Sequence, residues 1–201
     1  MEEKKYSAGG VKFSFWFSEF KKTIELINKG CSFEEIKDKV LNDNIFMTPT
    51  QARAKQIYVT VSNRVKSLEP SFYTLFEESD LLTQKLINLI AIMKSDQLLG
   101  EFVYEVYREK LMINMDELSD SDIRIFFKDK QMQSEKVAGW TDYTLKRLGG
   151  YYKMVLTEAG VIESGENSTR KIVKPIIDME LENHLKDEQM AYYYDALTGG
   201  K

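Results

Sequence analysis

The stretch from Leu118 to Pro175 constrains the fold more than any other part of the chain, because start and stop signals divide it into three short helices. Thr141 stands where the third helix begins, and threonine is a good N-cap residue. Gly160 ends that helix, and two β-prone pairs follow at 161–162 and 172–173. Three helices followed by a hairpin are typical of a winged helix-turn-helix, which places one helix in a DNA groove.

The third predicted helix, residues 141–159, has two distinct faces at about 100° per residue. One face is apolar and would pack on the rest of the domain. It consists of Leu145, Leu148, Tyr152, Val155, Leu156 and Ala159. The opposite face consists of Tyr143, Lys146, Arg147, Gly150 and Lys153. Because lysine and arginine neutralise phosphates, this basic face predicts contact with the DNA backbone. Thr141 and Tyr143 could donate hydrogen bonds to phosphates or base edges.

The returning strand of the predicted hairpin carries two further cations, Arg170 and Lys171. A wing in this position would bring them to phosphates beside the groove. The turn of the hairpin is expected at residues 165–168. The pair Gly149-Gly150 fits the third helix poorly, because each glycine there costs up to about 1 kcal/mol relative to alanine. Close approach of another backbone or a kink would explain it, and the sequence does not decide between them.

The N-terminal part contains a second pattern of the helix-turn-helix type. Ser32 and Glu35 form a capping box for a short helix. Thr48 is the expected N-cap of a longer helix that continues to about Leu68. This longer helix has a polar flank that would face DNA, and the cations on it are Arg53 and Arg64. Many helical hairpins share this pattern, so DNA contact here stays one alternative beside a purely structural role.

Two helices are expected in the middle of the chain. Residues 79–95 are apolar on nearly every side, which predicts a buried helix. The next helix, 96–112, would pair with it and carry Glu101 and Glu105 on a solvated outer face. These patterns suggest four parts: an N-terminal helical part at 1–78, a central scaffold at 79–118, a winged-helix-like part at 119–175 and an acidic helical tail at 176–201.

Composition supports a folded, mostly helical protein. Apolar residues make up 43% of the chain, and only three prolines interrupt it. We therefore predict an all-α fold class with one small β-hairpin. The net charge is −4, but contact with nucleic acid depends on local charge, and both helix-turn-helix-like parts are more basic than the rest.

Several classes of function are disfavoured by what the sequence lacks. One cysteine and one histidine cannot build a four-ligand zinc site. There is no phosphate-binding G-x-x-x-x-G-K-[ST] loop and no G-x-G-x-x-G motif, so we expect no enzyme, no cofactor and no small-molecule substrate. The longest apolar run is far shorter than the roughly 20 residues of a membrane span, and no signal peptide is evident. A cytoplasmic protein without membrane contact is expected.

Four long segments of the chain form a pattern in the order FWFSEFKKTIELI, RAKQIYVTVSNRVKSL, QKLINLIAIMKSDQLLGEFVYEVYREKL and LSDSDIRIFFKDKQMQSEKVAGWTDYTLKRL. In these segments the chain resembles the BrxA family of bacterial BREX phage-defence systems. The resemblance implies a mostly helical, non-enzymatic protein with helix-turn-helix-like parts. It further implies binding to double-stranded DNA and work alongside other BREX components.

The leading hypothesis is therefore a DNA-binding accessory factor that acts mainly through backbone electrostatics. An alternative is a protein-interaction module that assembles the defence complex without touching DNA, because a fold does not fix its use. RNA binding is less favoured, since recognition of single strands usually needs exposed aromatic side chains, and those of this chain fall mostly on predicted core faces.

Overall fold

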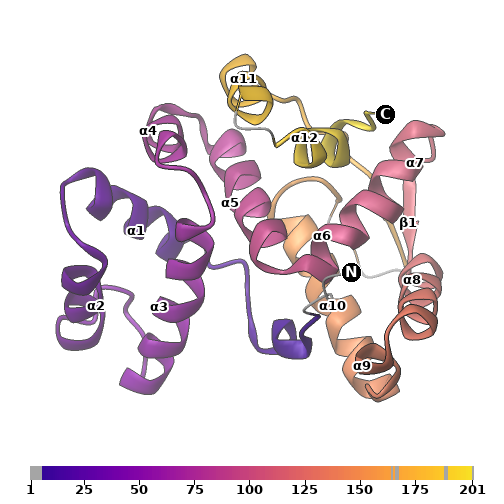
Figure 1. Cartoon of the computed structure of the whole chain (residues 1–201), viewed down its shortest axis with the longest axis horizontal. Coiled ribbons are helices and arrows are strands. Elements are labelled where there is room, and N and C mark those ends of the chain that lie inside the picture. The colour runs from indigo at the N-terminus through magenta and orange to yellow at the C-terminus, as the bar shows by residue number, and fades with distance from the viewer. Residues whose placement is uncertain (1–5, 164, 166–167, 188–189, 201) are drawn as a thin grey trace.

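The computed structural model describes residues 6–163, 165, 168–187 and 190–200. Helices dominate the described residues, and one small antiparallel sheet accompanies them. The molecule is elongated, with α1, α2 and α3 at one end and α8, α9 and α10 at the other (Figure 1). Helices α5 and α6 connect the two ends. The predicted class, mostly α with a small β element, is confirmed.

The N-terminal end is built from α1 (Phe17–Asn28), α2 (Phe33–Asn42), α3 (Gln51–Lys66) and α4 (Ser71–Glu78). The capping box of Ser32 and Glu35 forms as predicted. The predicted start of α3 is wrong by two residues. Thr50 is the N-cap and its hydroxyl accepts from the Arg53 N–H at 3.2 Å, whereas the Thr48 backbone and hydroxyl bond to Asn44. Helix α4 was not expected from the sequence.

The centre of the molecule consists of α5 (Leu81–Ser95), α6 (Gln97–Phe102), a π-helical turn at Val103–Tyr107 and α7 (Arg108–Met112). The prediction of a buried helix at 79–95 is confirmed, because α5 is buried over most of its length. The expectation of a solvated face at 101 and 105 is wrong for Glu101. Its carboxylate is buried and accepts hydrogen bonds from the Lys130 ammonium at 2.5 Å and the Tyr6 hydroxyl at 2.7 Å.

The C-terminal end contains β1 (Glu117–Ser119), α8 (Asp120–Gln133), α9 (Glu135–Ala138), α10 (Asp142–Glu158) and β2 (Thr169–Lys171). The expected pairing of 161–162 with 172–173 is present, as a bridge between Ile162 and Ile172. The sequence did not predict β1, which pairs antiparallel with β2, with Leu118 opposite Arg170. Part of the predicted hairpin turn, residues 166–167, lies outside the described residues.

The tail folds back as α11 (Met179–Asp187) and α12 (Ala191–Thr198), as the sequence indicated. Figure 1 shows both helices lying along one edge of the molecule, above α5 and α6. The Tyr192 ring stacks on Tyr104 with 4.4 Å between ring centroids, and its hydroxyl donates to the Gly100 carbonyl. The tail therefore packs on the central helices rather than extending into solvent.

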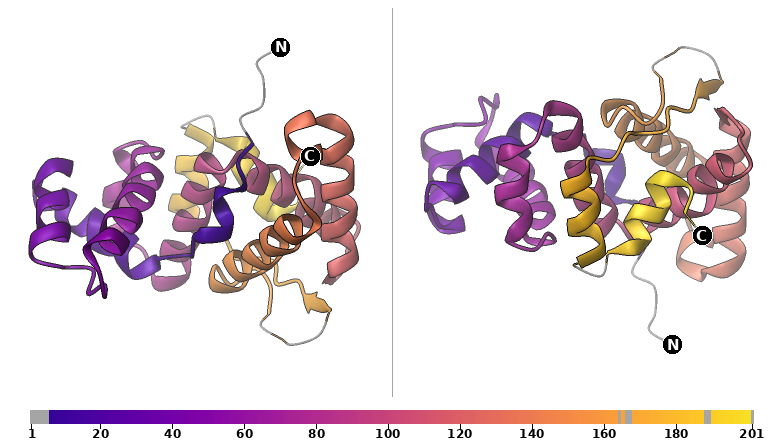
Figure 2. Two further views of the ribbon diagram at one scale, coloured as in Figure 1. Left: turned by 90° about the horizontal axis from the view of Figure 1, so that it is seen from below. Right: turned by 90° about the horizontal axis from the view of Figure 1, so that it is seen from above.

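The first described residues connect the two ends of the molecule. A short 3₁₀ turn at Ala8–Lys12 packs beside α10, and the chain then crosses to α1 at the far end (Figure 2). Gly10 lies against the Tyr151 ring, where a Cβ atom would come within 2.8 Å of a ring carbon. The Arg147 guanidinium donates to the Val11 carbonyl at 2.9 Å. The described N-terminal segment is thus folded against the C-terminal end of the molecule.

Candidate nucleic-acid interface

The N-terminal half of α10 presents the predicted basic face to solvent. Tyr143 is 70% exposed, and Lys146 and Arg147 are also exposed. The apolar face lies in the core, where Leu148, Val155 and Leu156 are fully buried. Thr141 is the N-cap, and its hydroxyl accepts from the Thr144 N–H at 3.2 Å. Its oxygen is therefore engaged in holding the start of the helix.

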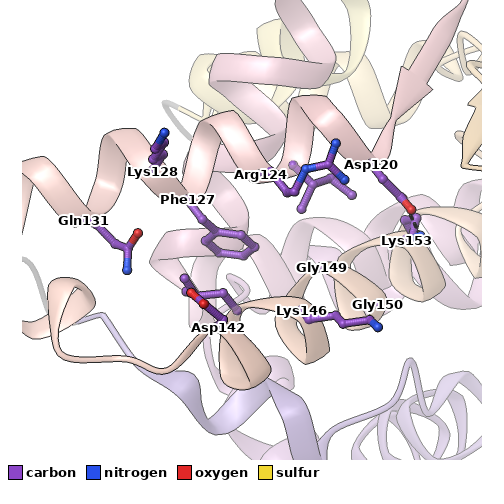
Figure 3. A pocket seen from close by; sticks show the side chains of 12 residues that line it. Asp120, Arg124, Phe127, Lys128, Gln131, Asp142, Lys146, Gly149, Gly150 and Lys153 are labelled. Carbon is purple, nitrogen blue, oxygen red and sulfur yellow. Dashed lines mark hydrogen bonds and ion pairs between the residues drawn. The ribbon is translucent and has the colours of Figure 1, made fainter.

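A groove of about 590 Å³ runs between α8 and α10 (Figure 3). The α10 wall includes Lys146, Gly149, Gly150 and Lys153, so the predicted basic face borders this groove. The α8 wall adds two cations that the sequence analysis missed, Arg124 and Lys128. They lie four residues apart on the exposed side of α8. Their i, i+4 spacing in the sequence could have indicated a basic face on this helix, but the same spacing is equally typical of an ordinary solvated face.

The two glycines of α10 explain why the helices approach closely and still leave a groove. A Cβ atom at Gly149 would lie 2.9 Å from the Ile123 Cγ2 atom, so α8 packs directly on this position. A Cβ atom at Gly150 would have no neighbour within 4 Å, because that position opens into the groove. Gly149 is therefore explained by the close approach of α8. At Gly150 no neighbouring atom requires a glycine.

This difference predicts opposite effects of alanine at the two glycines. Gly150→Ala is expected to raise the free energy of unfolding by about 0.5–1 kcal/mol, since alanine favours the helix and meets no obstacle. Gly149→Ala is expected to give no gain, because the same helix preference is offset by the clash with Ile123. Urea unfolding followed by circular dichroism measures both. Equal stabilisation by the two variants would contradict the close packing of α8 at Gly149.

Three groove cations have no ion pair or hydrogen-bonding partner among the described residues: Arg124, Lys128 and Lys146. The other predicted cations of α10 are engaged within the chain. The Lys153 ammonium pairs with the Asp120 carboxylate at 2.6 Å, and Arg147 holds the Val11 carbonyl while lying 5.9 Å from the Tyr143 ring centroid. The unpaired cations therefore sit on both rims of the groove rather than on α10 alone.

The cations of the predicted wing lie on β2. The Lys171 ammonium is exposed and lies 3.4 Å from the Glu163 carboxylate. The Arg170 guanidinium donates to the Thr169 carbonyl at 2.9 Å and is partly covered. Both residues lie on β2, which pairs with β1 beside α8, at the same end of the molecule as the groove.

The two cations predicted on α3 differ from each other. Arg53 is partly exposed, bonds to Gln56 at 2.9 Å and lies 5.2 Å from the Trp16 ring centroid. Arg64 is only 1% exposed, and its guanidinium donates to the carbonyls of Ser14 and Phe15 at 2.9 and 2.8 Å. The expectation that Arg64 faces DNA does not fit this position, because the side chain is enclosed by the segment before α1.

Within the described residues, no group of three or more His, Cys, Asp or Glu side chains could hold a metal ion. No helix in the described part of the chain is long and apolar enough to cross a membrane.

The fold and the groove together define a class: a mostly helical protein with a basic-rimmed groove between two helices at one end. A solved structure from Magnetospirillum magneticum, described as an uncharacterized protein, has the same fold, with a TM-score of 0.81 over 98% of this chain and 100% of that chain at 16% sequence identity.

The sequence comparisons narrow this class to one family. The BrxA family model matches residues 4–189. A protein of Bacillus cereus (strain H3081.97), named BREX protein BrxA, is 38% identical over 183 residues, which is 91% of each chain. The chain belongs to the BrxA family.

Proposed function

We propose that this protein is a non-enzymatic component of a BREX phage-defence system that binds double-stranded DNA. Membership in the BrxA family and the name of the Bacillus cereus relative support the BREX assignment. The observation that supports DNA binding best is the set of three unpaired cations, Arg124, Lys128 and Lys146, on the rims of one groove. Such cations gain free energy by replacing the counterions of phosphates.

The order of elements around the groove supports a winged helix-turn-helix. Helices α8, α9 and α10 follow one another with short turns, and β2 returns after α10 to pair with β1. In this reading α10 is the helix that approaches the duplex, and Lys171 contacts a phosphate nearby. Tyr143 is 70% exposed on the same helix, and in this proposal its hydroxyl donates a hydrogen bond to a DNA phosphate.

Recognition by this surface is mainly electrostatic. Bidentate base contacts use arginine, asparagine or glutamine side chains, and the exposed face of α10 carries only Arg147 of these types, already bonded to Val11. We therefore propose binding with little sequence preference, in the cytoplasm where the host and phage DNA meet. Arg53, at the opposite end of the molecule, is a secondary candidate contact.

The test is fluorescence anisotropy with a short random-sequence duplex between about 50 and 200 mM salt. The triple variant Arg124→Ala/Lys128→Ala/Lys146→Ala is compared with a control of equal charge, Lys22→Ala/Lys29→Ala/Lys37→Ala. The control lysines are exposed on or beside α1 and α2, at the far end of the molecule. The groove triple is expected to weaken binding at least about tenfold at low salt. It should also flatten the salt slope by about 0.9 for each phosphate that the protein no longer neutralises.

Circular dichroism establishes that both triple variants are folded. Equal weakening by the two triples would show that net charge alone governs binding. If the groove triple variant binds the duplex as tightly as the unmodified chain, the groove is not the DNA-binding site.

A second candidate function is assembly of the defence complex through protein contacts, with other BREX components as partners. The apolar floor of the groove favours it, because phosphates gain nothing from apolar surface. The two roles are compatible. If the protein binds no duplex at low salt, complex assembly is the proposed function that remains.

A further inference from the structure

We propose that the α8–α10 groove is a docking site for an amphipathic acidic helix of a partner protein. The floor of the groove, below the cationic rims, is formed by Ile123, Phe127 and Leu145. Most of the groove surface is apolar. DNA binding makes no use of this floor, so the rims and the floor together point to an occupant that is both apolar and acidic.

The groove is shaped to admit side chains. Gly150 carries no side chain and faces open space, so the α10 wall is low at this position. Figure 3 shows Phe127 pointing from α8 toward α10 between the two rims. A volume of about 590 Å³ is enough for several side chains of an incoming segment. Helix-in-groove binding places residues at i, i+3, i+4 and i+7 in such a space.

Charge complementarity selects an acidic occupant. Arg124, Lys128 and Lys146 are unpaired on the rims, whereas Asp142 is the only lining carboxylate among the described residues that is not already paired with a lysine. Carboxylates flanking an apolar stripe would meet these cations at the polar edge of the interface, where charges set the orientation and the rate of association.

The chain's own acidic tail does not supply this occupant. Leu181 and Leu185 of α11 and Leu197 of α12 are fully buried in the core, so the apolar side of each helix is already packed. A separate protein with an unpacked acidic helix is the occupant that fits. Because it would use the same cations as DNA, the two ligands are expected to compete. Docking itself does not depend on DNA binding.

The experiment uses the full chain and a synthetic helical peptide with leucines on one face and glutamates on the other. A second peptide keeps every glutamate and replaces the leucines with serine. Gly150→Leu fills the groove without removing any charge, and Gly139→Leu, at an exposed turn after α9, is the matched control. Binding is measured by fluorescence anisotropy, and duplex binding is measured on the same variants.

We expect the leucine peptide to bind at least about tenfold more tightly than the serine peptide, since the buried apolar side chains supply most of the affinity. Gly150→Leu should lower the affinity for the leucine peptide by about tenfold or more, while Gly139→Leu should leave this affinity unchanged. Duplex affinity should change less than peptide affinity in Gly150→Leu, because all rim cations remain. Measuring peptide affinity and duplex affinity on the same variants therefore tests the docking proposal separately from the proposed DNA binding.

Equal binding of the two peptides would overturn the proposal, since charge alone would then explain it. Unchanged peptide binding by Gly150→Leu would overturn it as well, because the groove would not be the site. Concentration-dependent self-association of the unmodified chain that Gly150→Leu abolishes would also overturn it, by identifying a second copy as the occupant.

Discussion

Replacing Lys130 with methionine is expected to lower the free energy of unfolding by about 3–5 kcal/mol. The Lys130 ammonium is buried and lies 2.5 Å from the Glu101 carboxylate and 2.7 Å from that of Glu105. Methionine keeps most of the side-chain volume, so the main loss is the charge. Glu101, whose side chain is 11% exposed, would then keep the hydrogen bonds from the Tyr6 hydroxyl and the Gln97 amide but lose the Lys130 ammonium. Removal of one partner of a buried ion pair is the cause of the large effect.

The contribution of the Lys130–Glu101 pair to stability depends on pH, and the direction of the Lys130 pKa shift determines how. Burial alone would lower the pKa of Lys130, but the hydrogen bonds to Glu101 and Glu105 outweigh it and raise the pKa above its usual value. A lysine whose pKa is raised on folding stabilises the protein fully below its unfolded pKa. The contribution is therefore present at neutral pH and is lost only as pH rises through the folded pKa.

Urea unfolding at neutral pH, followed by circular dichroism, measures the effect. Lys128→Met is the control on the same helix, and its exposed side chain should change stability by less than about 0.5 kcal/mol. The double variant Lys130→Met/Glu101→Gln should lose less than the sum of the two single losses, because the second change removes the carboxylate that Lys130 no longer pairs with. A loss in Lys130→Met no greater than in Lys128→Met would contradict a buried ion pair.

Arg64→Met is the second change with a large expected effect, a loss of about 3 kcal/mol or more. The Arg64 guanidinium holds the carbonyls of Ser14 and Phe15 and lies 5.4 Å from the Trp16 ring centroid. Trp16 precedes α1 with a left-handed backbone, at φ 47°. Without Arg64, the carbonyls of Ser14 and Phe15 lose charged hydrogen-bond donors, and the segment that leads into α1 loses two hydrogen bonds to α3.

The loss should also depend on pH through Asp96. Burial raises the pKa of Asp96 to about 6, and Arg64 opposes this rise. Without Arg64, the folded protein holds ionised Asp96 at a higher cost, whereas protonated Asp96 is unaffected. The destabilisation by Arg64→Met is therefore expected to be smaller near pH 4 and larger at about pH 7 and above. Stability curves at several pH values, with Lys55→Met on the exposed side of α3 as control, test this. A pH-independent loss would exclude coupling to Asp96.

The sequence predicted most helices, because their caps and apolar periodicity are local signals. Ser32 with Glu35 and Thr141 with its amphipathic helix illustrate this. The start of α3 was misplaced because Thr48 and Thr50 are both acceptable N-caps, and only tertiary structure decides between them. Strand β1 is three residues long and forms through pairing with a segment about 50 residues later, so local propensity does not reveal it.

Long-range burial limited the prediction of the site. Arg53 and Arg64 have similar neighbours in sequence, yet only Arg64 is covered, by residues 49 and 50 positions away. Lys130 and Glu101 likewise resemble surface residues of amphipathic helices until α8 packs on α6. Lys146 is exposed, as predicted. Arg124 and Lys128 become candidate contacts only because α8 packs beside α10 and places them on the rim of the groove.

The packing of Ala8–Lys12 on α10 has a consequence for how the molecule assembles during synthesis. The hydrogen bond from Arg147 to Val11 joins positions 136 residues apart. While the ribosome is still making the first hundred residues, the α10 surface on which this early segment packs has not yet been synthesised. Its docking on α10 must await the emergence of that helix, and a nascent chain halted before Tyr151 leaves Gly10 without the ring that covers it.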